Sequence, residues 1–318
     1  FHLTPFRRIW RSPLTGCEQH VYDELYTSDV WIQAHDEIMK QRREDDCQLE
    51  RVIVGMMFWS DTTHLAQFGH ASAWPIYLFF GIYPSKPIHH IYSHVTYLPE
   101  SIHSFISSFS TKKNNTDILT HCKRELIHAI WRILLDDEFI DGYRNGIVVK
   151  CFDGVIRRIY PQIFTYSADY PEKIILATLR DKGNCPCPRC LIPKSSFHQL
   201  GFLTDLSARL TLAWTYLQAK IDEARRAIYQ LGMPLKGVAV EHLLKAESLL
   251  PTWCALFPLS TSNSFSECLG QFSFNIFPVL VVDLLHEFEL GVAKSVLRHL
   301  IHLIHAIDPN LVNTLNER

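Results

Sequence analysis

Two aspartates stand where strands buried in a sheet are expected to end. Asp61 follows the apolar run Val52–Trp59, and Asp169 follows a second β-like run, Ile159–Tyr166. An ionised carboxylate at the end of a buried strand needs hydrogen-bond donors or a bound cation, because burying an unpaired charge is costly. Carboxylate oxygens are ligands that Mg²⁺ prefers, and a cluster of carboxylates can hold the two ions of a phosphoryl-transfer site. The pair therefore indicates metal-assisted chemistry on phosphodiesters.

Each aspartate also has a purely structural interpretation. Asp61 can cap the turn that follows it, and Asp169 stands two residues before Pro171, as an N-cap residue would. Capping a helix does not exclude binding a metal. Asp153 is the alternative second acid, but Gly154 follows it, and an Asp-Gly pair first indicates a tight turn.

Cys187 and Cys190 form a CxxC motif, the spacing that lets one turn present two thiolates to a single Zn²⁺. The motif is half a site, and His198, His242 and His286 are the candidates to complete it. Redox use of the pair and two unpaired thiols remain alternatives. The clustering of these cysteines favours structural zinc in a reducing compartment.

The order of the expected elements predicts the fold class. Three strands, a helix and a fourth strand region open the RNase H-like fold, in which the first and fourth strands lie side by side. Asp61 and Asp169 should then meet in space although 108 positions (169 − 61) separate them. We expect an α/β protein with an RNase H-like mixed sheet. The expected elements are strands at 52–59, 74–80 and 91–98, a helix at 118–133 and strand runs at 147–151 and 159–166.

The second half of the chain has a helical pattern. Apolar residues at spacings of three and four predict one helix of about seven turns over 206–231. A shorter helix is expected at 240–250 and another helical region at 279–307. This half is interpreted as a mostly α-helical insertion after the fourth strand. The expected division is an N-terminal polar segment at 1–50, the first part of the catalytic core at 51–190, and the insertion at 191–318, which ends before the rest of the core.

Composition limits the classes of function. The 318 residues are 47% hydrophobic and 20% charged, which is typical of a globular protein. The formal net charge of −2 gives no sign of a strongly basic nucleic-acid-binding surface and weighs against DNA binding by this chain alone. No apolar run reaches about 18 residues, so a membrane span is not expected.

Several blocks carry a family resemblance. Met57–Gly69 and Trp74–Gly81 look like segments of the Plavaka-type DNA transposases of fungi. Tyr166–Glu172, followed by the CxxC motif, and Asp283–Val292 do so too. Plavaka elements are similar to the CACTA transposons, and the arrangement resembles, more distantly, the catalytic subunit of the V(D)J recombinase.

The resemblance implies a DDE-type catalytic core that uses Mg²⁺ or Mn²⁺ to cut and transfer DNA strands. In the wider group an acid precedes a CxxC by just under 20 residues, and here the gap is 18 (187 − 169), which favours Asp169 over Asp153. The first acid matches Asp61. The resemblance also implies zinc at Cys187 and Cys190, with histidine ligands from further along the chain.

A third catalytic acid, a Glu after the insertion, is also implied. Glu287 and Glu289 are the candidates in this sequence, but no block here matches the one that carries the catalytic Glu of the family, so that Glu is expected beyond Arg318. The chain is therefore expected to be inactive as a fragment.

The expected partner of the full-length protein is DNA at the transposon ends, with a homo-oligomer as the active form and no membrane contact. The expected location is the nucleus, or the cytoplasm for a decayed copy. One alternative is a domesticated, transposase-derived binding protein without catalysis. Another is an unrelated zinc-stabilised hydrolase or nuclease that uses Asp153 and histidines.

Overall fold

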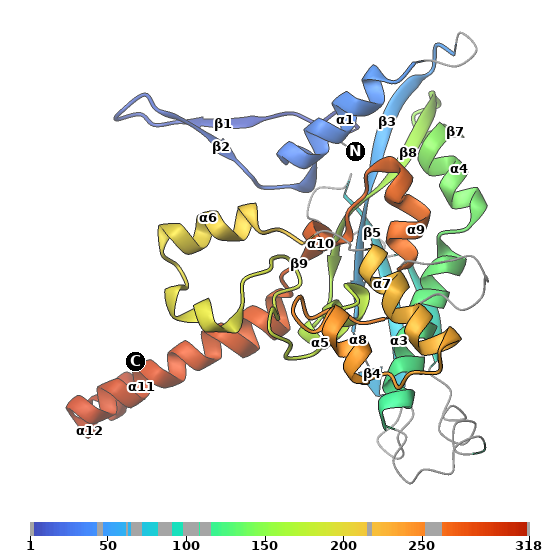
Figure 1. Cartoon of the computed structure of the whole chain (residues 1–318). Helices are drawn as coiled ribbons and strands as arrows, with labels where there is room; N and C mark the ends of the chain where they lie inside the picture. Colours follow the sequence, from blue (N-terminus) through green and yellow to red (C-terminus); the bar gives the residue numbers. More distant parts are fainter. Residues whose placement is uncertain are drawn as a thin grey trace.

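The computed structural model describes residues 3–42, 47–61, 63–64, 72–81, 91–97, 108, 116–214, 218–251 and 263–316. Its centre is a seven-stranded mixed sheet with helices packed on it, so the expected α/β class is confirmed (Figure 1). A separate two-stranded sheet pairs β1 (Arg8–Arg11) with β2 (Glu18–Val21). The strands of the large sheet are β3 (Glu50–Ser60), β4 (Thr63–His64), β5 (Ser72–Phe80), β6 (Ile91–Tyr97), β7 (Ile147–Lys150), β8 (Ile156–Ser167) and β9 (Leu280–Val281).

The two long strands β3 and β8 form the middle of the sheet. They run parallel from the pair Glu50↔Arg157 to the pair Trp59↔Ser167, which confirms that the first and fourth strand regions are neighbours. On the far side of β3, β5 is antiparallel and carries β4 and β6. The fourth region is a hairpin, because β7 pairs antiparallel with the start of β8, and β9 pairs parallel with its end.

Helices cover the sheet and fill the long connection between β8 and β9. The α-helices are α1 (Asp29–Lys40), α3 (Thr116–Leu134), α4 (Asp137–Asn145), α5 (Tyr170–Leu176), α6 (Leu203–Thr211), α7 (Gln218–Arg225), α8 (Val238–Leu244), α9 (Ser264–Leu269), α10 (Ile276–Val279), α11 (Lys294–Ile307) and α12 (Pro309–Asn316). The short 3-10 turns are η1 (Leu25–Thr27), η2 (Lys194–Gln199) and η4 (Gly270–Phe272), and the π-helical segments are η3 (Arg226–Gln230) and η5 (Leu284–Ala293).

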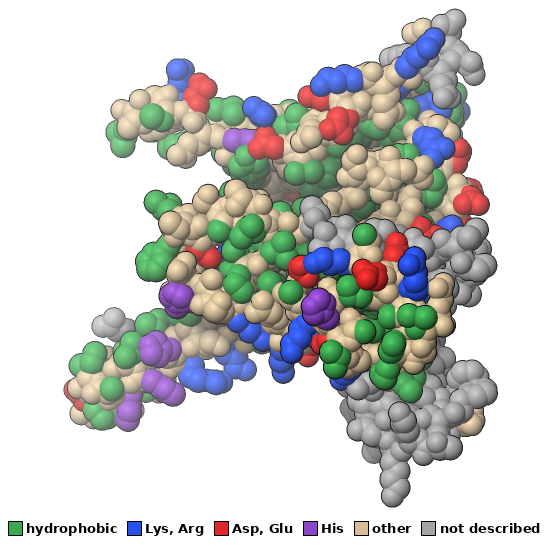
Figure 2. Space-filling view, in the orientation of Figure 1, with side chains coloured by type: hydrophobic (Ala, Val, Ile, Leu, Met, Phe, Trp, Pro, Cys, Tyr) green, Lys and Arg blue, Asp and Glu red, His purple; other side chains and the backbone are tan. Residues whose placement is uncertain are grey.

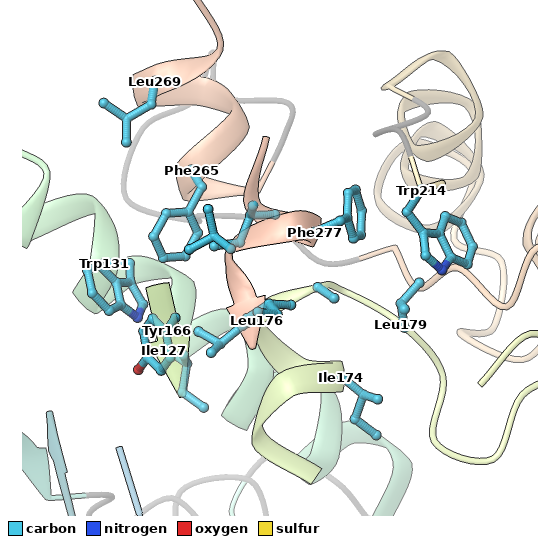
Figure 3. Close-up of a cluster of buried hydrophobic side chains, with 14 of the residues drawn as sticks. Ile127, Trp131, Tyr166, Ile174, Leu176, Leu179, Trp214, Phe265, Leu269 and Phe277 are labelled. Atoms are coloured by element: carbon cyan, nitrogen blue, oxygen red, sulfur yellow. The ribbon is translucent and has the colours of Figure 1, made fainter. Parts of the chain in front are cut away.

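The main core lies between the sheet and the helices α3, α5, α9 and α10. Trp131 of α3 is 1% exposed and packs edge-on to Tyr166 of β8, with ring centroids 5.5 Å apart. The ring centroid of Phe265 in α9 lies 4.8 Å from that of Trp131. Figure 3 shows Trp131 close to both Phe265 and Tyr166. These large rings fix the end of β8 against the helices, and β8 is the strand that leads to Asp169.

A second core covers the opposite face of the sheet. Trp31 of α1 is fully buried and stacks on Phe164, with centroids 5.0 Å apart. Its ring lies so close to β3 that a Cβ on Gly55 would stand 2.2 Å from it, and only glycine allows this approach. Within residues 1–50, expected to be a polar segment, the β1–β2 hairpin is largely exposed, and α1 is anchored in this core through Trp31 and Ile38.

The helix predicted over 206–231 is wrong as a single element. Trp214 interrupts it, fully buried, with its indole N–H donating to the carbonyl of Cys187 at 2.8 Å. The adjacent Ala213 forms a β-bridge to Cys190. Tertiary pairing with the cysteine loop therefore overrides the helical periodicity, and α6 and α7 are separate helices.

The helices α11 and α12 project from the body as an arm (Figure 1). Figure 2 shows hydrophobic and histidine side chains exposed along it. None of the described helices combines the length and the apolarity needed to cross a membrane. The large apolar side chains exposed on the arm are Val296, Leu297, Leu300, Leu303, Ile307, Leu311 and Leu315.

Candidate active site

Three aspartates follow three adjacent parallel strands at the same level of the sheet. In the register, Trp59 of β3 pairs with Ser167 of β8, and Ser167 pairs with Val281 of β9. Two residues beyond each partner stands an aspartate: Asp61, Asp169 and Asp283. Because equivalent positions past the ends of neighbouring parallel strands lie at one edge of a sheet, the three aspartates share that edge.

Asp169 is the central acid, and it caps α5. Its Oδ1 accepts a hydrogen bond of 2.9 Å from the Glu172 N–H, as the N-cap interpretation predicts. Burial raises the pKa of the Asp169 carboxyl, and the Glu172 N–H opposes this shift. The negative charges of Asp61 and Asp283 raise the same pKa further. The three carboxylates are thus electrostatically coupled, which supports the predicted proximity of Asp61 and Asp169.

Asp283 is buried and caps η5 in the same way. Its Oδ1 accepts from the His286 N–H, and its Oδ2 accepts from the His286 Nδ1–H, both at 2.9 Å. Burial raises the pKa of Asp283, but the bonds from His286 outweigh it and hold the pKa below its usual range. The pKa of His286 is raised by its bond to Asp283 and by the charges of Asp283, Asp61 and Asp169. The acidic cluster therefore favours the protonated form of His286.

A buried hydrogen-bonded chain ties the end of β3 to α5 below the aspartates. Ser60 Oγ donates to Glu172 Oε2 at 2.5 Å, and the Tyr166 hydroxyl donates to Ser60 Oγ at 3.0 Å. Glu172 is only 2% exposed. These bonds hold the residue before Asp61 against residues on either side of Asp169.

The donor set of the cluster fits a hard divalent cation. Three carboxylates supply oxygen ligands, and a cation would relieve the repulsion that raises the pKa of Asp169. Within the described ranges, no three His, Cys, Asp or Glu side chains are placed closely enough to hold one metal ion. The sheet sets the backbone positions of Asp61, Asp169 and Asp283, but their side chains would have to rotate to bind one shared ion.

Asp153, the alternative second acid, lies at the other end of β8. Its carboxylate pairs with Arg157 at 2.7 Å, and its Oδ1 accepts from the Val155 N–H at 3.0 Å. The bond from Arg157 lowers the pKa of Asp153. The 12 residues of β8 place Asp153 about 35 Å from Asp169. Asp153 is thus a turn residue and does not join the cluster.

Glu287 and Glu289, the candidate third acids, both lie on η5. Glu287 Oε2 accepts from the Asp283 N–H at 3.0 Å and forms an ion pair with Lys173. Glu289 is exposed. The carboxylate of Glu287 is therefore bonded to Lys173 and to the Asp283 N–H, beside the three aspartates.

The CxxC motif forms a turn beside Trp214, where the structure brings the two cysteines together. Burial raises the pKa of the Cys190 thiol, and the neighbouring Cys187 raises it further. Arg209 Nη1 donates to Cys190 Sγ at 3.4 Å. Two adjacent thiols fit one zinc ion. Neither His198 nor any other described histidine joins them in a set of three ligands.

Asp283 is the acid that sequence reasoning did not assign. The signal was present, since Ile276–Val282 is an apolar run that ends in an aspartate, as does the run before Asp61. β9 is two residues long, however, and so short a strand has no periodicity to detect. Its pairing with β8 is visible only in the structure.

The structure thus defines an α/β protein with an acidic, cation-suited edge. The Plavaka transposase family model matches residues 1–304, and the chain belongs to that family. No curated protein and no solved structure shows a significant match.

Proposed function

We propose that this chain is the catalytic core of a DDE-type transposase with an RNase H-like fold. It would cut and transfer DNA strands at Asp61, Asp169 and Asp283. The observation that carries the proposal is the register of β3, β8 and β9, which sets one aspartate two residues past each paired position. Family membership supports DNA as the substrate.

The strand arrangement supports the RNase H-like interpretation. β5 lies antiparallel beside β3, and β8 and β9 follow parallel on its other side, with α3 between β6 and β7 in the chain. The helices from α5 to α10 separate β8 from β9 and form the insertion. Because β9 returns to the sheet, Asp283 can complete a three-carboxylate set without a Glu beyond Arg318.

Each residue of the cluster has a defined task in this proposal. Divalent ions held at such a site activate an attacking hydroxyl and stabilise the leaving oxygen of a phosphodiester. Asp169 keeps one carboxylate oxygen bonded to the first turn of α5, which leaves its other oxygen for an ion. Both oxygens of Asp283 are bonded to His286, so an ion would have to displace the His286 side chain from Oδ2. His286 balances the negative charge of the cluster before an ion arrives.

A second candidate is a transposase-derived binding protein without catalysis. It is favoured by one observation, that no three ligand side chains converge in the described part of the chain. A protein that retained the fold for DNA or protein contact would need no such convergence.

The test compares Mn²⁺ binding of the wild type with three variants, Asp61→Asn, Asp169→Asn and Asp283→Asn. Paramagnetic resonance of free Mn²⁺ gives the dissociation constant. Each variant should weaken binding at least about tenfold, since even the loss of an outer-shell partner typically has an effect of that size. The matched control is Asp153→Asn, an aspartate in the turn between β7 and β8 that should leave the affinity unchanged.

The outcomes separate the two candidates. Saturable binding by the wild type, lost in the three variants, together with Mg²⁺-dependent nicking of duplex DNA, supports the catalytic core. DNA binding without Mn²⁺ binding supports the non-catalytic protein. Equal Mn²⁺ affinity in all three variants and the wild type refutes the assigned site.

The remaining assignments complete the proposal. Cys187 and Cys190 would hold a structural Zn²⁺ that fastens the insertion to the sheet, and the adjacency of their thiols supports this. Transposon-end DNA is the proposed partner, a homo-oligomer the proposed active form, and the nucleus the proposed location, in keeping with the family.

A further inference from the structure

A buried ion pair links the two helical turns that begin at Asp169 and Asp283. Lys173 stands four residues after Asp169, and Glu287 four residues after Asp283. The N–H of Lys173 donates to the Asp169 carbonyl at 3.0 Å, and the N–H of Glu287 donates to the Asp283 carbonyl at 3.1 Å. The two residues thus occupy equivalent places in the first turn of α5 and of η5.

The pair contacts the backbone that carries the third aspartate. Lys173 Nζ donates to Glu287 Oε2 and, at 2.8 Å, to the carbonyl of Val281. The same Glu287 oxygen accepts from the N–H of Asp283 at 3.0 Å. One ammonium and one carboxylate therefore hold the chain immediately before and at Asp283.

The Lys173 side chain of this ion pair is buried, which makes the pairing energetically important. The side chain of Lys173 is 3% exposed and that of Glu287 is 27% exposed. Loss of Glu287 would leave the buried ammonium of Lys173 without its counter-charge, so the intact pair is preferred over the separated groups. β9 contributes only two residues to the sheet, and its pairing with β8 alone is a weak constraint on Asp283.

We propose that Lys173 and Glu287 are positioning residues that lock Asp283 beside Asp169. The inference rests on the proposed function in assigning a cation to the cluster. Neither residue needs to touch the cation. Their role is to hold β9 and the start of η5 in the position in which the three aspartate carboxylates can share one cation.

The first measurement is hydrogen exchange at the amide of Asp283 in the metal-free protein. This N–H is bonded to Glu287, so its protection reports directly on the lock. Lys173→Met keeps the length of the side chain and removes the charge, and it should speed exchange there at least tenfold. Lys173→Arg, which retains charge and donors, should restore most of the protection. Arg180→Met, which breaks the separate ion pair with Glu241, is the control and should leave Asp283 unchanged.

The second measurement is the Mn²⁺ dissociation constant of the same proteins, taken well below each melting temperature. Lys173→Met should weaken binding at least tenfold, and Lys173→Arg less than threefold. A merely structural role would lower the melting temperature of Lys173→Met without changing the affinity of the folded protein. If Lys173→Met does not fold, Lys173→Gln replaces it, since glutamine is uncharged but keeps a polar end at this buried position. Glu287→Gln, which retains an acceptor for the Asp283 amide, tests whether Glu287 itself binds the ion.

Three results would overturn the inference. The first is unchanged exchange at Asp283 in Lys173→Met or its substitute. The second is unchanged Mn²⁺ affinity in a variant with fast exchange. The third is loss of binding in Glu287→Gln with normal binding in Lys173→Met, which would make Glu287 a ligand. Failure of the wild type to bind Mn²⁺ would instead refute the proposed function, and the exchange measurement would still decide the lock.

Discussion

His128 should make the folded protein sensitive to mild acid. It is a fully buried residue of α3 whose Nε2–H donates to the carbonyl of Ile175 in α5 at 3.1 Å. Its Nδ1 is buried and has no hydrogen-bond partner within the described ranges. A proton added at Nδ1 would be a buried charge without a partner. Burial accordingly lowers the pKa of His128 to about 4, against the opposing effect of the Ile175 bond.

The sign and size of the effect follow from linkage. The unfolded chain binds the His128 proton near pH 6.5, whereas the folded chain resists it until about pH 4. Protonation therefore favours the unfolded state across this window, and stability is lost as the pH falls through it. At about 1.36 kcal/mol per pKa unit, the free energy of unfolding should fall by about 3 kcal/mol.

Urea unfolding at pH 7.5, 6.5, 5.5 and 4.5 measures this loss. His128→Gln is the comparison, because glutamine can still donate to the Ile175 carbonyl but does not titrate. The free energy of unfolding of the wild type should fall more steeply than that of the variant, by about 2.5 kcal/mol between pH 7.5 and 4.5. The comparison also removes the contribution of His121, whose pKa is likewise lowered to about 4 by burial and by Arg225 and Arg124. Parallel curves for the two proteins would refute the reasoning.

Two further predictions concern the second core and the cysteines. Trp31→Ala should cost about 3–5 kcal/mol in the free energy of unfolding. Trp10→Ala, at a residue 49% exposed, should change it by less than about 0.5 kcal/mol, and an equally small cost for Trp31→Ala would show that α1 is not part of the core. Cys187→Ser and Cys190→Ser should each lose the proposed zinc, measured by atomic absorption of the purified protein, and a variant that retains a full equivalent would contradict the assignment.

The parts of the site that could be predicted were those that follow long apolar runs or a helix-capping pattern in the sequence. The apolar run before Asp61 predicted β3, and the order of the elements predicted its pairing with β8. Asp169 was recognised as a helix cap, and the structure confirms the bond to Glu172. Eleven and twelve residues of strand supply enough burial pattern to be visible in the sequence.

The parts not predicted depend on contacts between distant residues. The helix expected over 206–231 failed because Trp214 is drawn into the cysteine loop. The role of α1 rests on Trp31 fitting over Gly55, a complementarity of shape that no periodicity shows. Asp283 was missed because β9 has only two residues, and only its pairing with β8 in the structure shows that Asp283 lies beside Asp169.

The separation of the three aspartates along the chain has a consequence for biosynthesis. Asp61 and Asp283 are 222 residues apart (283 − 61), which a ribosome adds in about 10–40 s at roughly 5–20 residues per second. Once residue 167 has been made, about halfway through that interval, β3 and β8 can pair, but the third aspartate does not yet exist. A nascent chain therefore cannot assemble the proposed cation site while its insertion is still being made. The proposed cleavage of DNA would begin only after β9, the last of the described strands, has paired with β8, so synthesis itself would delay it.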